Sequence, residues 1–154
     1  MRRLAVFVCS FGYIGFFPVA PGTIGSAAGV VVYLAARYAA LPYLDLVIIV
    51  GLAVAGVALT RPCEEDLRCV DPGPIVIDEV MGMLMTLFMI PVGWGGILLG
   101  FLLFRALDVM KPFPARRLER LHGGYGVMAD DAMAAIYANL LLRGAYYFAP
   151  GWLS

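Results

Sequence analysis

Long apolar segments make up most of this chain, and they alternate with short breaks that hold proline, glycine and nearly all of the charged residues. Of the 154 residues, 62% are hydrophobic and 14% are charged, whereas a soluble domain carries about 25% charged residues. A chain of this length buries only part of its surface in its own core. Much of the apolar surface must therefore face lipid, and we predict an integral membrane protein.

Five apolar segments are predicted to be helices, because a chain inside a bilayer must satisfy its backbone hydrogen bonds internally. They cover residues 24–40, 43–59, 79–90, 95–110 and 131–148. The first two are about 17 residues long, the lower limit for a membrane span, and the third would extend for only about 18 Å. A turn at residues 91–96 separates the third from the fourth. We expect one all-α domain over residues 1–154, a small helical membrane bundle built from short helical hairpins.

The N-terminal segment has the features of a secretory signal, since Arg2 and Arg3 precede an apolar run that ends at Ala20. The residues around Ala20 fit a small-x-small cleavage pattern poorly. We therefore expect the segment to be retained as a shallow interfacial or re-entrant element.

Charge and cysteine content argue against two classes of function. The net charge is zero at pH 7, so no basic excess indicates nucleic-acid binding. The three cysteines, Cys9, Cys63 and Cys69, have no second pair or nearby histidine that would indicate a zinc site. We expect reduced thiols.

If the helices pair as hairpins, the charged ends of the segments meet on one face of the membrane. That face would carry the acids at positions 78, 79, 108, 130 and 131 and five arginines, Arg61, Arg68, Arg116, Arg117 and Arg120. The opposite face would receive Arg37, Asp45 and Arg143. The positive-inside tendency makes the charged face cytoplasmic.

The first candidate cluster is the glycine-rich turn at residues 21–26, which opens the first apolar helix. Thr23 is placed to cap that helix, and free N–H groups at a helix start attract anions such as phosphate. The structural alternative is a simple cap, with Gly25 and Gly29 spaced for close helix packing. The residues assigned to phosphate binding are Gly22, Thr23 and Ser26, together with Arg105 and Lys111 further along the chain.

Two adjacent acids, Asp78 and Glu79, begin the third segment directly after the apolar residues 75–77. Two carboxylates beside a bilayer are costly unless they are paired, protonated or bound to a cation. The structural alternative makes Asp78 the helix cap and Glu79 a first-turn acid favoured by the helix dipole. Capping accounts for one acid better than for two.

Arg105, Asp108 and Lys111 are spaced three residues apart, so they lie along one side of the end of the fourth segment. An ion pair within a helix stabilises it by only about 0.2–0.5 kcal/mol. This gain is small compared with the cost of placing charges directly after an apolar segment. Lys111 is the only lysine in the chain, which indicates a need for a compact charge, as phosphate binding has. Asp130 and Asp131 then repeat the earlier arrangement of a glycine-rich turn, two acids and an apolar helix.

Five carboxylates thus converge on one interface, from Asp78, Glu79, Asp108, Asp130 and Asp131. Carboxylate ligands without cysteine or several histidines favour Mg²⁺ before Mn²⁺ or Ca²⁺. The neighbouring cations suit an anionic group that also contacts the metal, and phosphate is the natural candidate. Adjacent helical residues point about 100° apart, so one acid of each pair would bind metal and its neighbour would support it. The sequence leaves open which one.

These residues give the chain a resemblance to the phosphatidylglycerophosphatase A family, bacterial membrane enzymes that dephosphorylate phosphatidylglycerophosphate to phosphatidylglycerol. The stretches that carry it are residues 21–26, 75–79 with Gly82, 104–108 with Lys111, Pro112 and Pro114, and 122–131. They occur in the family's order over essentially the whole chain. The resemblance implies a helical, Mg²⁺-dependent hydrolase of the bacterial inner membrane, multi-pass, with a lipid substrate and a site facing the cytoplasm. Ala134-Ala135, where the family pattern has Ala-Gly, is a departure that concerns packing.

The predicted mechanism has Glu79, Asp108 and Asp131, helped by Asp78 and Asp130, holding Mg²⁺. Lys111, Arg105 and the amides near Thr23 would stabilise charge on the phosphoryl oxygens. Attack by water and a covalent phospho-enzyme both stay open, as do the role of His122 as proton donor and the oligomeric state. The alternative function is a small ion- or proton-coupled transporter, although the acids here lie at segment ends rather than near mid-membrane.

Overall fold

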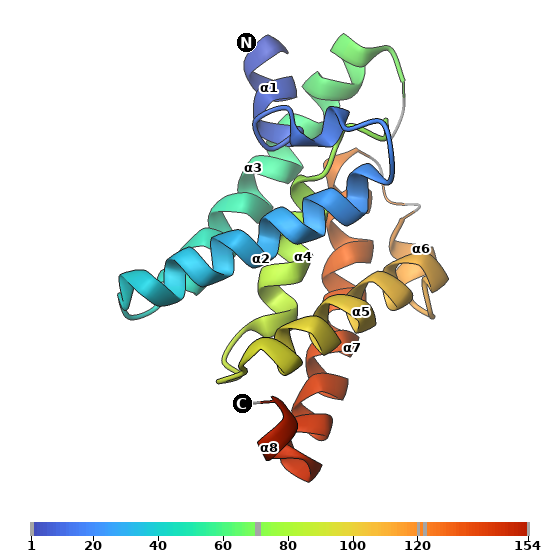
Figure 1. Cartoon of the computed structure of the whole chain (residues 1–154). Helices are drawn as coiled ribbons and strands as arrows, with labels where there is room; N and C mark the ends of the chain where they lie inside the picture. The colour runs from blue at the N-terminus through green and yellow to red at the C-terminus, as the bar shows by residue number, and fades with distance from the viewer. Residues whose placement is uncertain (1, 70–71, 120, 122, 154) are drawn as a thin grey trace.

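The computed structural model of the protein describes residues 2–69, 72–119, 121 and 123–153, and this part of the chain is helical without strands (Figure 1). In chain order the elements are α1 (Arg2–Cys9), the 3-10 helix η1 (Ile14–Phe16), α2 (Pro21–Ala39), α3 (Leu44–Leu67), α4 (Ile77–Leu87), α5 (Trp94–Met110), α6 (Ala115–Leu118), α7 (Gly124–Phe148) and α8 (Pro150–Leu153). The all-α prediction is confirmed, and each of the five predicted segments is a helix.

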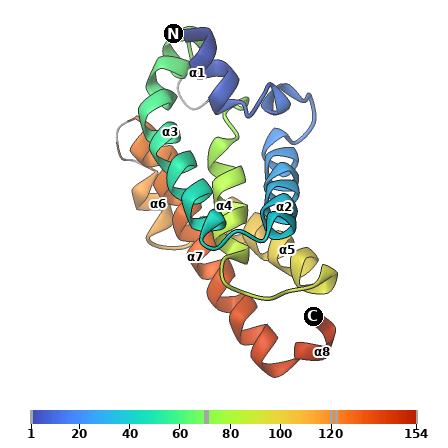
Figure 2. The same cartoon turned by 90° about the vertical axis from the view of Figure 1, so that its left-hand side faces the viewer.

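Helix α4 lies at the centre, with α2 and α7 packed on it and α3 and α5 completing its surroundings (Figures 1 and 2). It has only 11 residues, and nine of them are buried. Its apolar side chains, among them Met83, Leu84 and Leu87, form a core with Phe104 of α5 and Leu142 of α7. A short helix that is apolar on all sides is stable here because other helices cover it.

Glycines bring α2 and α4 into close contact. A Cβ atom placed on Gly25 would lie 2.8 Å from Cβ of Val76, and one on Gly29 would lie 2.7 Å from Cβ of Met83. Real side chains do not approach so closely, so the two glycines permit the observed separation of the helices. The close-packing interpretation of Gly25 and Gly29 is confirmed.

Helix α3 is the one helix in the described part of the chain that is long and apolar enough to cross a membrane. Most of its apolar stretch is not buried within the protein, and Val47 and Val54 are each about two-thirds exposed. Exposed apolar side chains also occur on α5 and α7, for example Leu102 and Leu140. Residues 24–40, which the sequence offered as a second span, correspond to α2 and do not meet the same test. A multi-pass bundle therefore stays a prediction.

Two helix boundaries differ from the sequence prediction. Helix α3 continues through Pro62 to Leu67, whereas the predicted segment ended at residue 59. Its last turns contact α1, and Cys9 and Cys63 are buried in one core cluster, so tertiary packing outweighs the local effect of proline. Helix α7 begins at Gly124, not at residue 131. Its first turn lies so close to α3 that a Cβ on Gly124 would be 2.7 Å from Cα of Val57.

The helix starts also differ from the predicted caps. The N-cap of α2 is Ala20 in a left-handed conformation, without a side-chain hydrogen bond. Thr23 is the third residue of the helix, and its amide donates to the Ala20 carbonyl at 3.0 Å, so the prediction that Thr23 caps α2 was wrong. The N-cap of α4 is Val76, so Asp78 is not a cap either. The N-terminal segment forms α1 and η1, and its interfacial or re-entrant character stays a prediction.

Candidate active site

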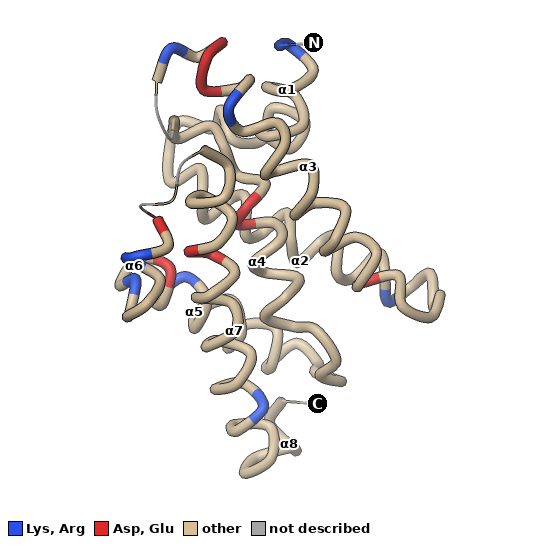
Figure 3. The backbone as a smooth tube through the Cα atoms, turned by 180° about the vertical axis from the view of Figure 1, so that it is seen from behind, with Lys and Arg blue, Asp and Glu red and all other residues tan. Residues whose placement is uncertain are grey.

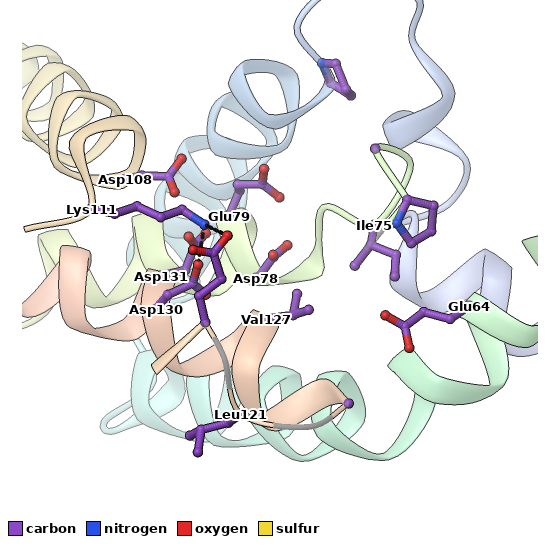
Figure 4. A pocket seen from close by; sticks show the side chains of 15 residues that line it. Glu64, Ile75, Asp78, Glu79, Asp108, Lys111, Leu121, Val127, Asp130 and Asp131 are labelled. Carbon is purple, nitrogen blue, oxygen red and sulfur yellow. Dashed lines mark hydrogen bonds and ion pairs between the residues drawn. The ribbon is translucent and has the colours of Figure 1, made fainter. Parts of the chain in front are cut away.

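The acidic residues singled out in the sequence meet in one pocket of about 320 Å³, formed where α2, α4, α5 and α7 come together (Figure 4). Six predicted site residues line it: Asp78, Glu79, Asp108, Lys111, Asp130 and Asp131. Pro21 at the start of α2 and Glu64 of α3 also line it, and Glu64 stands apart from the acidic cluster. Acidic and basic residues gather around this end of the protein, and few lie towards α8 (Figure 3).

Three of the carboxylates converge. Asp78, Glu79 and Asp131 each present an oxygen within 4.8 Å of those of the other two. Asp78 and Asp131 are buried, and one oxygen of each of the three carboxylates is enclosed without a hydrogen-bond partner among the described residues. Buried carboxylate oxygens without donors are costly, and the charges of the three groups repel one another.

A divalent cation would remove both costs. Carboxylate oxygens are the ligands that hard cations prefer, and the set contains neither sulfur nor imidazole. The residues present therefore fit a bound divalent cation, and Asp78, Glu79 and Asp131 are the ones placed to hold it. Position in the first turn of α4 further favours the negative charge of Asp78 and Glu79, because the N-terminal end of a helix is positive.

Asp108 has a different partner. Nη1 of Arg105 donates to its Oδ2 at 2.7 Å and lies 4.0 Å from Oε1 of Glu79. Arg105 and Asp108 are three residues apart on the last turns of α5, as their spacing indicated. The guanidinium does not line the pocket, but it contacts two carboxylates that do. The guanidinium therefore places positive charge beside Asp108 and Glu79, outside the pocket that they line.

Asp130 is also paired. The ammonium of Lys111 donates to Oδ2 of Asp130 at 2.7 Å and to Oε1 of Glu119 at 2.8 Å. Burial by itself lowers the pKa of Lys111, but these two hydrogen bonds outweigh it and hold the pKa above the usual range of a lysine. Lys111 therefore stays charged at any physiological pH. Of the two adjacent acids on α7, Asp131 joins Asp78 and Glu79 in the candidate cation site, and Asp130 pairs with Lys111.

The glycine-rich turn contributes only in part. A Cβ on Gly22 would overlap Oε1 of Glu79 and lie 3.2 Å from both terminal nitrogens of Arg105, so Gly22 lies directly against the site. Thr23 and Ser26 do not line the pocket. The hydroxyl of Ser26 is buried and donates to the Gly22 carbonyl at 2.9 Å. The structure brings Gly22 to the acidic cluster and does not bring Thr23 or Ser26 there.

The segment between α5 and α7 contains two further residues that bear on the site, His122 and Glu119. His122, the candidate proton donor, lies outside the described residues. Glu119 was missed, because in the segment between α5 and α7 only the arginines and His122 were considered. Its signal is modest: an acid in a segment that is otherwise basic, eight residues after the only lysine.

The fold and the pocket define a small helical protein with an exposed apolar surface, in which buried carboxylates able to hold a divalent cation lie beside two basic side chains. This combination suits chemistry on an anionic group such as a phosphate ester. A family model described as phosphatidylglycerophosphatase A matches residues 7–146. The chain belongs to this family and is a phosphoric monoester hydrolase, as the resemblance in the sequence implied.

Curated relatives agree with that assignment. The phosphatidylglycerophosphatase A of Escherichia coli is 37% identical over 136 residues, which covers 87% of this chain and 76% of the relative. That of Haemophilus influenzae is 36% identical over 136 residues, 87% of this chain and 83% of the relative. A putative phosphatidylinositol-3-phosphatase of Bacteroides thetaiotaomicron is 33% identical over 139 residues, which covers 85% of this chain and 86% of the relative. No solved structure matches the chain. These relatives do not favour the transporter alternative.

Proposed function

We propose that this protein hydrolyses the terminal phosphomonoester of phosphatidylglycerophosphate, releasing phosphatidylglycerol and inorganic phosphate in glycerophospholipid synthesis, with Mg²⁺ as its cation. The observation that carries the proposal is the convergence of carboxylate oxygens of Asp78, Glu79 and Asp131 within 4.8 Å, where one buried oxygen of each has no hydrogen-bond partner in the described part of the chain. Family membership and two relatives of that name support the choice of substrate.

The pocket residues divide into two groups in this proposal. Asp78, Glu79 and Asp131 hold the cation, which supplies positive charge for the phosphoryl oxygens. Lys111 and Arg105 add fixed positive charge on the α5 side, where they interact with Asp130 and Asp108. Such preorganised charges stabilise a phosphoryl group most strongly where water is excluded. This division differs from the sequence prediction, in which Glu79, Asp108 and Asp131 held the metal with help from Asp78 and Asp130.

The start of α2 completes the proposed phosphate site. Gly22 lies against Glu79 and Arg105, so its backbone is near a carboxylate that would hold the cation. Amide groups at the start of a helix favour anions. The absence of a side chain at Gly22 leaves room for a phosphoryl group to approach the start of α2.

The experiment that tests the function is release of inorganic phosphate from phosphatidylglycerophosphate in detergent micelles. Phosphatidylinositol 3-phosphate and glycerol 3-phosphate serve as comparison substrates, the first because one relative is named for it. We expect fastest release from phosphatidylglycerophosphate, loss of release with EDTA and its return with Mg²⁺. Release from phosphatidylinositol 3-phosphate alone would assign a different lipid, and release that EDTA leaves unchanged would contradict the cation.

We also propose that the protein is a multi-pass protein of the bacterial inner membrane with its pocket on the cytoplasmic side. Helix α3 is one candidate span, and Cys69, just after its C-terminal end, is exposed. Glu64 of the same turns lines the pocket, so Cys69 reports the side on which the pocket lies. A membrane-impermeant maleimide should label Cys69 in inverted vesicles and not in right-side-out vesicles. The reverse pattern would place the pocket outside.

A further inference from the structure

The ammonium group of Lys111 is held by two carboxylates from different parts of the chain. Asp130 of α7 accepts a hydrogen bond from it at 2.7 Å, and Glu119, directly after α6, accepts another at 2.8 Å. An ammonium group has three N–H donors. Two are therefore engaged with these carboxylates, which leaves one N–H for a further acceptor, and Lys111 lines the pocket.

Glu119 is itself fixed in place relative to α7. Its amide donates to the Ala115 carbonyl at 3.0 Å, which makes it the C-cap of α6. A Cβ on Gly126 of α7 would lie 2.8 Å from the Glu119 carbonyl oxygen and would overlap that of Leu121. The missing side chain at Gly126 thus lets the first turn of α7 pack directly on the backbone at Glu119.

The rest of this segment is also attached to α7. The hydroxyl of Tyr137 donates to the Phe113 carbonyl at 2.9 Å, and the guanidinium carbon of Arg117 lies 4.8 Å from the centre of the Phe113 ring. Helix α7 therefore sets the positions of both groups that hold Lys111: Asp130 directly, and Glu119 through its backbone.

We propose that Glu119 is a positioning residue for phosphate chemistry: together with Asp130 it holds the Lys111 ammonium at the pocket, so that its third N–H points to a phosphoryl oxygen. This inference rests on the proposed function for its catalytic consequence, but the holding of Lys111 by Glu119 can be measured without it. Gly126 serves the same purpose indirectly, because it allows the close approach of α7 to Glu119.

The competing explanation is an ordinary surface ion pair. The Glu119 side chain is 43% exposed, and exposed pairs contribute little to stability. Removal of Glu119 should therefore leave the fold intact on either explanation. Glu65 supplies a matched control: it is an exposed glutamate that also has two basic neighbours, Arg2 at 3.8 Å and Arg61 at 3.5 Å, and it does not line the pocket.

The first measurement uses the fact that Lys111 is the only lysine. Acetic anhydride acetylates it only as the neutral amine, which two carboxylates disfavour. We expect Glu119→Ala to raise the acetylation rate of Lys111 about tenfold, as followed by mass spectrometry of peptides from intact protein in micelles, and Glu65→Ala to leave it unchanged. An unchanged rate in Glu119→Ala would show that Glu119 does not hold the ammonium and would overturn the proposal.

The second measurement is phosphate release by the same variants. We expect kcat of Glu119→Ala to fall about tenfold, since the lysine loses one of two anchors. Glu119→Gln, which keeps an acceptor oxygen, should stay within about threefold of the unmodified protein. In a Lys111→Met background, loss of Glu119 should cause no further decrease, because the two residues act together.

Three results would contradict the catalytic part: full activity of Glu119→Ala, equal damage from Gln and Ala, or additive losses in the double variant. Gly126→Ala checks the packing argument, since it should raise Lys111 acetylation as Glu119→Ala does. If the unmodified protein releases phosphate from no substrate, the proposed function is wrong. The acetylation rates still decide whether Glu119 holds Lys111.

Discussion

Asp78 and Asp131 present carboxylate oxygens within 4.8 Å of each other, although one belongs to α4 and the other to α7. The packing of these two helices therefore creates the candidate cation site. Small residues make that packing possible: Ala134, Ala135 and Ala138 of α7 are all buried in the same core as α4. The alanine at 135, where the family pattern has glycine, is fully buried there, so its effect falls on helix packing.

Gly22→Ala should lower activity on the order of 100-fold, because the new methyl group would displace Glu79 and the Arg105 guanidinium. Gly51→Ala is the matched control, since a Cβ at Gly51 of α3 would have no atom of the described residues within 4 Å. Phosphate release by the two purified variants checks this expectation. Full activity of Gly22→Ala would mean that the start of α2 does not constrain the site.

Gly29→Ala should reduce the free energy of unfolding by about 1–3 kcal/mol, the usual range for an added methyl group in a packed core. Its Cβ would lie 2.7 Å from Cβ of Met83 and 2.9 Å from the Val80 carbonyl oxygen, so α2 and α4 would have to separate. Gly144→Ala in α7, with open space around it, should be neutral or stabilising by up to about 1 kcal/mol. Thermal unfolding in detergent compares the two, and equal melting temperatures would contradict the packing argument.

The thiols should differ in their reaction with iodoacetamide. Burial, with a further contribution from Cys63, raises the pKa of Cys9 to about 12, whereas Cys69 is exposed. A raised pKa lowers the fraction of reactive thiolate. At pH 8 we therefore expect Cys69 to be modified on the order of 100-fold faster than Cys9, and the rate at Cys9 to keep rising up to pH 10. Peptide mass spectrometry measures both rates, and similar rates in folded protein would contradict the burial of Cys9.

The sequence predicted the helices and most of the site because both depend on local patterns. Apolar runs located α2, α3, α4, α5 and α7. The acids directly beside such runs are Asp78, Glu79, Asp108, Asp130 and Asp131, and all five line the pocket together with Lys111. These signals are strong because each charge beside an apolar helix must have a partner.

Other features depend on tertiary contacts and could not be read locally. The division of the Asp130–Asp131 pair is one example: Asp130 pairs with Lys111 and Asp131 joins Asp78 because of the orientation of α7 against α4 and α5. Glu119 is another, since its partner lies across a loop. The expected cap at Thr23 was wrong because Ala20 adopts a left-handed conformation and begins the helix earlier.

The most direct test of the account compares Asp131→Asn with Asp66→Asn for phosphate release from phosphatidylglycerophosphate with saturating Mg²⁺. Asp131 is buried in the carboxylate cluster, and Asp66 is exposed at the end of α3, outside the pocket. We expect Asp131→Asn to lose more than about 100-fold in rate while it stays folded, because a cation ligand is removed. Asp66→Asn should keep full activity. If folded Asp131→Asn releases phosphate at the unmodified rate, the three carboxylates do not hold the catalytic cation and the account is wrong.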